Sequence, residues 1–455
     1  MNFTSINPYT EEVVATYAFI SEDALEQAVA KAHTAQKHWK QTPVKQRVLF
    51  FKQLSHLLTE HAEELAVVAV EEMGKTLKEA KLEVLKCARG CDYYATQAEH
   101  LLQPQTSIAE TGKTVELQYQ PLGIVLGIFP WNFPYWQIIR SAVPTVIAGN
   151  AMLVKPAPNT PRCALALVKL IEQCDLPAGL IQFIFANESQ IAKLLSDDRI
   201  QAATLTGSEK AGSAVASTAA KHIKKSVLEL GGSDPFIVLP NANIETTLNT
   251  AITARFQNNG QSCIAAKRFI VHQSIADIFL AGLIGRIQQL NIGNPLLADT
   301  DIGPLARKDL MGKLASQVET SLNQGAQLLY QSTLQSNSKG YFYPPTILGN
   351  ITPDCLAWHE ELFGPVISFY TFEHIEQAID IANATSFGLG ASIWGSDTEN
   401  AKSIAHQIES GQVFINEMVK SQPTHPFGGV KKSGYGRELG PFGLYEFCNI
   451  KTVWY

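Results

Sequence analysis

The chain has 455 residues, 45% of them hydrophobic and 17% charged, and its formal net charge at pH 7 is -6. A chain of this length exceeds the size at which one hydrophobic core stops growing, so we expect two or more domains in a globular protein. The charge forms no run, and no stretch of about 18 apolar residues occurs, which argues against nucleic acid or membrane partners and favours a small molecule.

The start of the chain and the cysteines predict a cytoplasmic protein with reduced thiols. Residues 1–10 lack the basic segment, apolar stretch and cleavage site of a secretory signal. The seven cysteines are an odd number spread thinly, which argues against a disulfide framework. Cys87 and Cys91 have the spacing of half a metal site, but no second Cys/His pair accompanies them. We therefore predict helix packing for this pair and no metal site.

The first predicted elements are helices, and a strand ribbon follows them. Leu25, Val29 and Ala32 form an apolar stripe at helical spacing, and similar spacing continues through residues 23–101. From Thr114 the residues alternate between apolar and polar, as in a half-buried strand, directly after a turn-like segment at 110–113. This pattern predicts an exposed β-ribbon.

Strands and helices then alternate twice. The first alternation places strands at 123–129, 151–155, 181–186, 202–206 and 226–230, a rhythm that predicts a parallel, doubly wound sheet. The second runs from Phe236 to about Thr424 and includes strands at 268–272, 366–372 and 411–416. The last strand, 450–455, has no local partner, so we expect it to pair with a distant strand, an edge in another subunit included.

Two loops at strand ends are candidates for binding a cofactor. Gly207 and Ser208 end a strand and open a helix, where free backbone N–H groups and the helix dipole favour a phosphate. The alternative is ordinary turn chemistry, because the Gly-x-Gly-x-x-Gly fingerprint is absent. Lys155 begins a proline-rich loop, 155–161, and its amine is placed to reach a ribose or a phosphate. The alternative there is a surface lysine.

Cys263 is the cysteine whose setting suits a nucleophile. It lies in the polar, glycine-containing loop 259–263, whereas the other six cysteines lie in or beside apolar or helical patterns. Glu229 ends an apolar strand just before two glycines, so burial would raise its pKa toward the range of a general base. The alternative for Glu229 is a solvated residue at the rim of the sheet.

Taken together, the motifs resemble those of the aldehyde dehydrogenase superfamily. They are Pro130–Pro134 (PWNFP), Lys155, Gly207-Ser208, Glu229–Gly232 (ELGG), Gly260–Cys263 (GQSC) and Glu361–Pro365 (ELFGP). The resemblance covers the whole chain and implies an α/β fold with a Rossmann-type cofactor domain, an α/β catalytic domain and a small β oligomerisation element. We assign residues 1–101 and 121–231 to the first, 232–435 to the second, and 102–120 and 436–455 to the third, which implies a homodimer or homotetramer.

The resemblance also implies a role for each matched residue. Cys263 would attack the aldehyde carbon, while Asn132 and the Cys263 N–H would hold the oxyanion. Glu229 would activate the water that hydrolyses the thioester. The remaining matched positions would bind NAD or NADP: Trp131, Lys155, Pro158, Gly207, Ser208, Leu230, Glu361 and Phe363.

Two departures from the family pattern carry consequences. NAD-preferring relatives have a glutamate that repels a 2′-phosphate where this chain has Pro158, so we expect NADP to be tolerated. Some relatives have a second cysteine two residues after the nucleophile, where this chain has Ala265. A disulfide switch at the nucleophile is therefore not expected.

Within the superfamily, the likeness is nearest to succinate-semialdehyde dehydrogenases, through segments 130–137, 260–271 and 427–438. Arg140 and Ser421 match residues that bind the substrate carboxylate in related enzymes, and the alternative for Arg140 is a surface ion pair. An arginine of some relatives is replaced by Gln257. Trp131, Tyr135 and Trp136 are candidates for the wall of the substrate tunnel, and the alternative is that aromatic residues at this spacing belong to the core. A broader enzyme for other ω-carboxy aldehydes such as glutarate semialdehyde, a CoA-acylating relative and a non-catalytic homologue are the alternatives.

Overall fold

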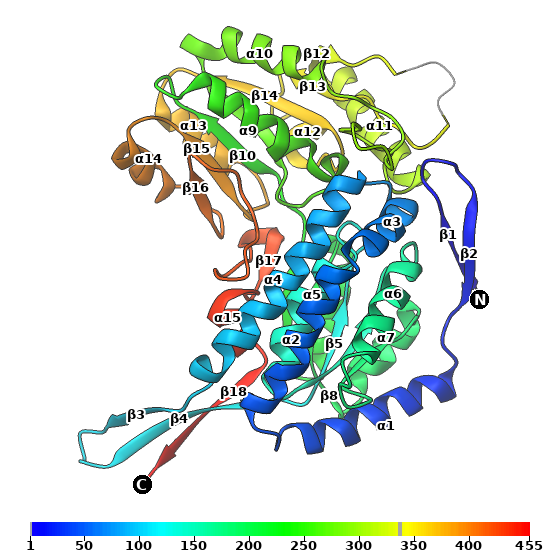
Figure 1. Ribbon diagram of the computed structural model, residues 1–455. Helices are drawn as coiled ribbons and strands as arrows, with labels where there is room; N and C mark the ends of the chain where they lie inside the picture. Colours follow the sequence, from blue (N-terminus) through cyan, green and yellow to red (C-terminus); the bar gives the residue numbers. More distant parts are fainter. Residues whose placement is uncertain (1, 335–338) are drawn as a thin grey trace.

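Two large β-sheets form the framework of the protein, which we describe from a computed structural model over residues 2–334 and 339–455 (Figure 1). The first sheet has six strands in the order β17-β9-β8-β5-β6-β7. Its strands are β5 (Ile124–Ile128), β6 (Ala151–Lys155), β7 (Ile181–Phe183), β8 (Ile200–Thr206), β9 (Lys225–Glu229) and β17 (Gly434–Tyr435). All neighbours are parallel except β17 and β9. The expected α/β class with a Rossmann-type sheet is confirmed.

The strand order of this sheet creates a binding position. After β5 the chain moves outward through β6 and β7, and then returns to the other side of β5 with β8. Ligands of such sheets bind where the order reverses, outside the carboxyl ends of the strands. The segment Pro130–Asn132 after β5 and the pair Gly207-Ser208 after β8 therefore lie at one edge.

The second sheet has seven strands in the order β12-β13-β14-β11-β10-β15-β16. Its strands are β10 (Asp234–Val238), β11 (Ala266–His272), β12 (Gln327–Gln331), β13 (Thr346–Gly349), β14 (Val366–Phe372), β15 (Ala391–Trp394) and β16 (Val413–Ile415). The neighbours are parallel except β12 and β13. Apolar runs predicted β11, β14 and β16 closely, whereas the short strands β12, β13 and β15 carried no clear signal.

Helices cover both sheets. Those of the first half are α1 (Glu22–Trp39), α2 (Val44–Glu60), α3 (Ala62–Met73), α4 (Leu77–Leu101), α5 (Trp136–Ile147), α6 (Pro161–Glu172), α7 (Glu188–Ser196) and α8 (Glu209–Lys221). Those of the second half are α9 (Ile244–Phe256), α10 (Gln273–Ile287), α11 (Lys308–Asn323), α12 (Leu356–His359), α13 (Ile375–Asn383), α14 (Thr398–Ala405) and α15 (Gly440–Tyr445). Among the described residues, no helix is long and apolar enough to cross a membrane.

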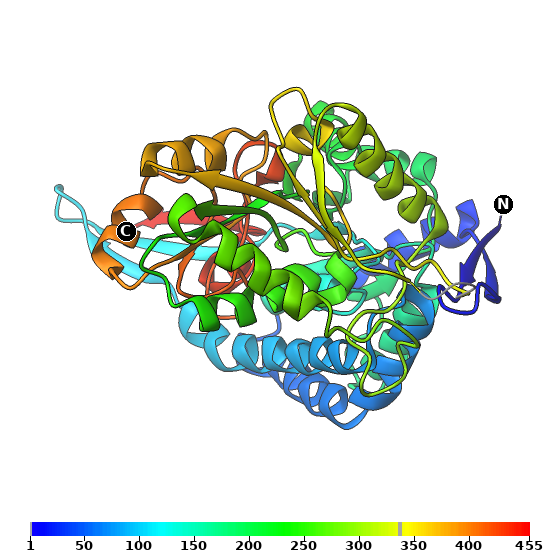
Figure 2. The same cartoon turned by 90° about the horizontal axis from the view of Figure 1, so that it is seen from above.

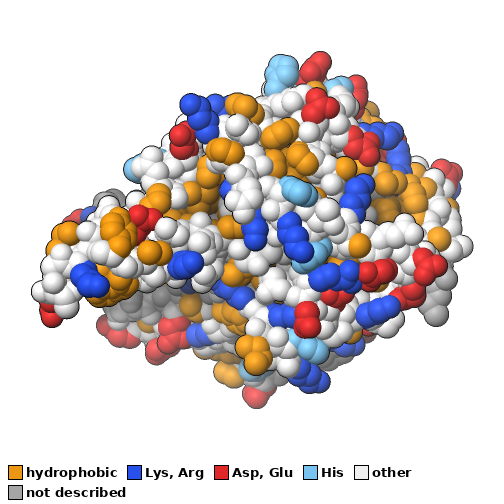
Figure 3. Space-filling view, turned by 90° about the horizontal axis from the view of Figure 1, so that it is seen from below, with side chains coloured by type: hydrophobic (Ala, Val, Ile, Leu, Met, Phe, Trp, Pro, Cys, Tyr) orange, Lys and Arg blue, Asp and Glu red, His pale blue; other side chains and the backbone are white. Residues whose placement is uncertain are grey.

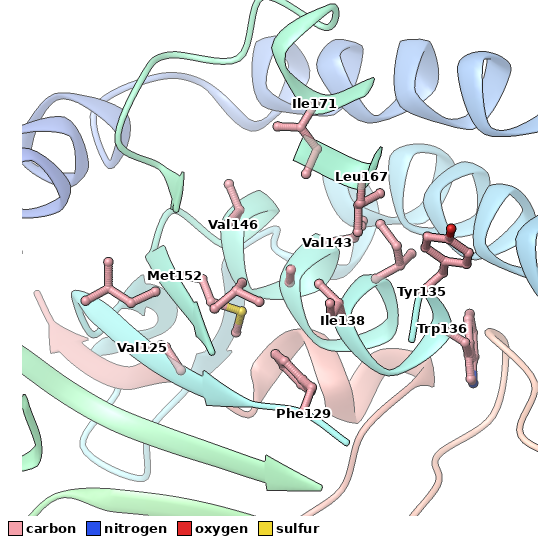
Figure 4. Close-up of a cluster of buried hydrophobic side chains, with 14 of the residues drawn as sticks. Val125, Phe129, Tyr135, Trp136, Ile138, Val143, Val146, Met152, Leu167 and Ile171 are labelled. Carbon is pink, nitrogen blue, oxygen red and sulfur yellow. The ribbon is translucent and has the colours of Figure 1, made fainter. Parts of the chain in front are cut away.

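Helix α5 is the element that links the core to the site. All of its residues are buried, and it packs against α4 on one side and β5 and β6 on another. Figure 4 shows its apolar side chains, Ile138, Val143 and Val146 among them, within a cluster that also takes Val125 of β5 and Met152 of β6. Any polar side chain on α5 must therefore find its partners inside the protein.

A three-stranded arm projects from the body (Figures 1 and 2). Its strands are β3 (Gln105–Ile108), β4 (Thr114–Pro121) and β18 (Cys448–Trp454), all antiparallel, with β18 along β4. The last strand thus pairs with a distant strand of its own chain, as expected, and it forms an edge of the arm's sheet. At the opposite side of the molecule, β1 (Asn2–Ile6) and β2 (Val13–Ala18) form a hairpin that the sequence did not predict.

The domain boundaries remain a prediction, and the two-residue strand β17 bears on one of them. Strand β17 lies within the range 232–435 assigned to the catalytic domain, yet it adds to the first sheet beside β9. Met1 and residues 335–338 belong to the assigned ranges but lie outside the described residues.

Candidate active site

Cys263 lies where two cavities meet. We call the first the helix-side cavity; it has a volume of about 680 Å³ and is bounded by α4, α5 and loop 418–424. The second, the sheet-side cavity, has a volume of about 570 Å³ and opens at the ends of β5, β8 and β9. Both include Cys263 in their lining. A sulfur in this position is accessible to one ligand from each side.

The loop before Cys263 has an unusual backbone that its side chains hold in place. Asn258, Asn259 and Gly260 all adopt left-handed conformations, with φ of 57°, 57° and 74°. The Asn258 amide donates to the backbone carbonyl of Asn132 at 2.9 Å. A Cβ at Gly260 would lie 2.5 Å from the carbonyl carbon of Gly364, so glycine is required. The candidate nucleophile is therefore held by a rigid loop.

The thiol of Cys263 is half-buried and is not ionised by its surroundings alone. Burial raises its pKa to about 12, although the charges of Arg140 and Lys267 act in the opposite direction. The Lys267 ammonium donates to the carbonyls of Ser262 and Cys263, both at 2.8 Å. Because the thiolate is the reactive form, a base must take the proton during the reaction.

Asn132 is placed to donate a hydrogen bond beside the sulfur. It lines the sheet-side cavity together with Cys263 and is 5% exposed. Its side-chain nitrogen donates to the carbonyl of Gln261 at 3.1 Å. An amide nitrogen has two N–H groups, so one remains for a developing oxyanion.

Glu229 ends β9 and is buried, as the general base hypothesis requires, but it lines neither cavity. Burial, followed by the charge of Glu438, raises its pKa well above the ordinary value. Among the described residues, neither of its carboxyl oxygens has a hydrogen-bond partner. A Cβ at Gly232, three residues later, would lie 2.6 Å from the Cys263 carbonyl oxygen, so the two segments are adjacent.

The sheet-side cavity contains groups suited to the nicotinamide and phosphate parts of a dinucleotide cofactor. Gly207 and Ser208 line it at the N-terminus of α8, where the Ser208 hydroxyl accepts from Ala211 N–H at 3.3 Å and caps the helix. The rings of Trp131 and Phe363 meet edge to face at 5.9 Å between centroids. Leu230 is also part of the lining, between the helix start and the cysteine loop.

Glu361 occupies the same cavity and is held by a lysine. Its Oε1 lies 3.0 Å from the Lys267 ammonium and accepts from Gly232 N–H at 3.2 Å. A Cβ at Gly231 would lie 2.6 Å from its other oxygen, so a side chain there would displace the carboxylate. Such a carboxylate is a suitable partner for ribose hydroxyls.

Two expected cofactor residues lie outside the cavity lining. Lys155 ends β6, next to β5 at the same sheet edge, and burial lowers its pKa. Pro158 follows it and is exposed. Both residues lie where β6 ends, outside the lining of the sheet-side cavity, and there they would contact the adenosine end of a dinucleotide.

Comparison with known proteins decides the family. The model of the aldehyde dehydrogenase family matches residues 1–453. The chain belongs to this family. It is 46% identical to succinate-semialdehyde dehydrogenase [NADP(+)] 1 of Mycobacterium tuberculosis, with both chains covered in full. It is 34% identical to the solved succinic semialdehyde dehydrogenase of Streptococcus pyogenes in complex with NADP+, with a TM-score of 0.97, covering 100% of this chain and 99% of that one.

The helix-side cavity of this aldehyde dehydrogenase contains the three expected substrate residues. Trp136 and Ser421 meet there, the indole N–H donating to the hydroxyl at 3.1 Å. Arg140 lines the cavity as well, but its Nε lies 2.6 Å from a carboxylate oxygen of Glu438, and both side chains are buried. Gln257 occupies the position of the arginine found in some relatives and reaches the lining.

Two aromatic residues expected in the substrate tunnel lie elsewhere. Tyr135 is fully buried in the core, where its hydroxyl donates to the carbonyl of Leu65 at 2.9 Å (Figure 4). Trp131 lines the sheet-side cavity instead, beside Phe363. The tunnel expectation is wrong for these two, because Tyr135 directly precedes α5 and points into the core, whereas Trp131 lies in the segment after β5 at the edge of the sheet.

Several residues of the site carry no signal in the sequence. Lys86 on α4 lines the helix-side cavity, and nothing in a helical pattern distinguishes it from a surface lysine. Lys267 lies four residues after Cys263, and the hydrogen bond from its ammonium to the Cys263 carbonyl depends on the conformation of the loop between them. Glu438 lies in segment 427–438, and the resemblance of that segment to relatives implies no role for this residue. Among the described residues, no group of three or more His, Cys, Asp or Glu side chains is arranged to hold a metal ion.

Proposed function

We propose that this aldehyde dehydrogenase oxidises succinate semialdehyde to succinate with NADP or NAD. The observation that carries the proposal is the position of Cys263 between the sheet-side cavity, which contains most of the expected cofactor residues, and the helix-side cavity, which contains basic side chains and Ser421. The names of the mycobacterial and streptococcal relatives support the same substrate and cofactor.

The chain's own residues account for the first chemical step. A water molecule takes the proton of the Cys263 thiol to solvent, the sulfur bonds to the aldehyde carbon, and the oxyanion of the resulting thiohemiacetal is held by the Asn132 amide and the Cys263 N–H. Glu361 and Phe363 would hold the ribose and ring of the nicotinamide, and Gly207 and Ser208 a phosphate. The cofactor, when bound, accepts the hydride that leaves the thiohemiacetal carbon, and a thioester remains on the sulfur.

The second step is hydrolysis of the thioester, for which Glu229 is the base. In the geometry described, its carboxylate lies beside Glu438 and outside both cavities, so it must rotate toward the sulfur to receive a proton from water. The resulting hydroxide attacks the thioester carbon, the C–S bond breaks, and Glu229 passes its proton to the sulfur, which restores the Cys263 thiol. The product leaves as succinate after its new carboxyl group loses a proton to solvent. A base at this position distinguishes the chain from CoA-acylating relatives.

The cofactor preference depends on one loop. With Pro158 exposed and no carboxylate in its place, the 2′-phosphate of NADP meets no negative charge there. Pro158→Glu should lower kcat/KM for NADP at least tenfold and leave that for NAD within about threefold, because only NADP carries the repelled group. Steady-state kinetics with both cofactors measure the effect. An equal loss with both would contradict the assigned role of this position.

The proposal is tested by cofactor reduction at 340 nm with succinate semialdehyde, butyraldehyde and glutarate semialdehyde. A strong preference for succinate semialdehyde supports the proposal, whereas equal rates with all three aldehydes would indicate an aldehyde dehydrogenase of broad substrate range. One extra methylene changes apolar binding by only about 1 to 3 kcal/mol, so the four- and five-carbon semialdehydes need not differ greatly.

Two variants test the assigned catalytic roles and the alternative of a non-catalytic homologue. Cys263→Ala should abolish turnover. Glu229→Gln should retain a burst of reduced cofactor, equal to the enzyme concentration, followed by slow steady-state turnover. Equal and mild effects of the two would contradict the roles. Assembly through the arm into a homodimer or homotetramer, and a cytoplasmic location, are the remaining parts of the proposal.

A further inference from the structure

Lys86 is a charged side chain of the helix-side cavity that the chemistry described above does not use. It projects from α4 and its ammonium donates to the Ser421 hydroxyl at 2.6 Å. The same ammonium lies 4.4 Å from the centroid of the Trp136 ring. Because Trp136 N–H also donates to this hydroxyl, the Ser421 oxygen receives two hydrogen bonds and its own hydrogen remains to be donated.

Most other charges near this cavity are already compensated. The charge of Arg140 is balanced by Glu438 at 2.6 Å, and that of Lys420 by Glu417 at 2.8 Å. Within residues 2–334 and 339–455, Lys86 has no carboxylate within 4.0 Å, because its helical neighbour Glu83 pairs with Lys75. Arg89, one turn further along α4, is exposed to solvent. Lys86 is thus a half-buried cation of the cavity that has no carboxylate partner among the described residues.

A half-buried cation that lines a cavity and has no counterion is a favourable partner for the negative charge of a ligand. We infer that Lys86, together with the Ser421 hydroxyl, binds the free carboxylate of the substrate in the helix-side cavity. The inference rests on the proposed function, because it requires a substrate that carries a carboxylate. Lys86 holds the far end of the molecule, while Cys263, in the same cavity lining, receives the aldehyde.

The test compares a charged and an uncharged aldehyde of equal chain length in Lys86→Met, which keeps an unbranched side chain against Trp136. We expect kcat/KM for succinate semialdehyde to fall roughly 10- to 100-fold, the range for losing one hydrogen bond to a charged group, mainly through KM. Butyraldehyde should change by less than about threefold. Succinate should also become a correspondingly weaker inhibitor of butyraldehyde oxidation.

Lys81→Met is the matched control, because Lys81 lies on the same helix, pairs with Glu63 on the surface and does not line the cavity. It should leave both substrates unchanged. Lys86→Arg should recover part of the preference, and Lys86→Gln makes the same comparison if the methionine variant does not fold.

The outcomes separate the inference from the function on which it rests. If the native enzyme prefers succinate semialdehyde and Lys86→Met keeps that preference, the inference is overturned and the proposed function stands. An equal loss with both aldehydes also overturns it, since a purely structural role would have that effect. If the native enzyme does not distinguish the two aldehydes, both the proposed substrate and the inference fail.

Discussion

At the scale of single residues, the site depends on charges that are buried and compensated. Arg140 lies on a helix with no exposed face, and Glu438 is its counterion at 2.6 Å. The Arg140 side chain also donates to the Thr206 hydroxyl at 3.2 Å and lies 5.1 Å from the centre of the Phe427 ring. Removal of either charge leaves the other unpaired in the interior.

Arg140→Met should therefore destabilise the protein, by about 3 to 5 kcal/mol, because Glu438 is left as an unpaired buried charge. The midpoint of urea unfolding measures the loss. The double variant Arg140→Met/Glu438→Leu should recover much of it, since the unpaired carboxylate is then removed as well. If the single and double variants unfold at the same urea concentration, the pair is not the source of the loss.

Lys86 predicts a pH dependence that is specific to the charged substrate. Burial lowers its pKa to about 7; the charges of Arg140 and Arg89 act in the same direction, and Cys87 and Glu83 oppose them. Below that pH the ammonium is protonated and binds a carboxylate, whereas above it the free enzyme loses the charge. Lys420 of loop 418–424 also lines the cavity, paired with Glu417.

The ratio of kcat/KM for succinate semialdehyde to that for butyraldehyde should thus fall as the pH rises from about 6 to about 9. Titration of Cys263 and Glu229 affects both substrates and cancels in the ratio. Lys86→Arg, whose guanidinium stays charged, should give a flat ratio across this range. A ratio that is equally flat in the native enzyme would contradict the assignment.

The residues that the sequence identified are those whose neighbours along the chain define their environment. Cys263 and Gly207 lie in polar, glycine-containing loops, and this local setting was sufficient to single them out. Lys86 gains its role from Ser421, which is 335 positions away in the chain. No local pattern contains such a contact, so the structure was needed to find it.

At the scale of elements, α4 joins the substrate side of the site to the core. The start of α5 has no side-chain cap of its own. Instead, one oxygen of Glu83 on α4 accepts from the N–H groups of Tyr135 and Trp136 at 2.9 and 3.0 Å. The other oxygen accepts from the Lys75 ammonium at 2.5 Å. One carboxylate thus caps α5 and neutralises a fully buried lysine.

Glu83→Ala should cost about 3 kcal/mol or more, because it removes a helix cap and leaves Lys75 as an unpaired buried charge. It should also raise KM for the aldehyde, since Trp136 begins the helix that loses its cap. Glu63→Ala, which breaks the exposed pair with Lys81, is the control and should have little effect on either quantity. Urea unfolding and steady-state kinetics measure the two effects, and equal losses in both variants would contradict this role.

Elements with apolar runs could be predicted, whereas their arrangement could not. The strand at 366–372 was predicted with the bounds that the structure has. The placement of β8 beside β5, which puts Gly207 near Asn132, depends on crossovers that no single segment encodes. Strands of two to four residues, β17 among them, lack the length to show an alternation.

At the scale of the whole molecule, the arm formed by β3, β4 and β18 projects from the body. Figure 3 shows hydrophobic side chains along the projecting arm at the left of the view. Ile450 and Trp454 of β18 are 58% and 55% exposed, and strand geometry places them on one face because they are four residues apart. An exposed apolar strand face favours contact with another subunit.

Ile450→Lys combined with Trp454→Lys should therefore reduce the mass of the assembly in solution. Both side chains are exposed in the single chain, so the fold should remain intact, and circular dichroism checks this. Sedimentation velocity measures the mass of the native protein and of the variant. If the native protein sediments as a monomer, the result contradicts the proposed assembly through the arm.

The meeting of the two cavities at one sulfur has a consequence for chemical probes. An electrophile that fits the helix-side cavity reaches Cys263 without crossing the space that a dinucleotide occupies. Alkylation by such a reagent would then be slowed by succinate and would continue with the nucleotide bound. Covalent ligands for this enzyme can accordingly be built for the helix-side cavity and need not resemble a dinucleotide.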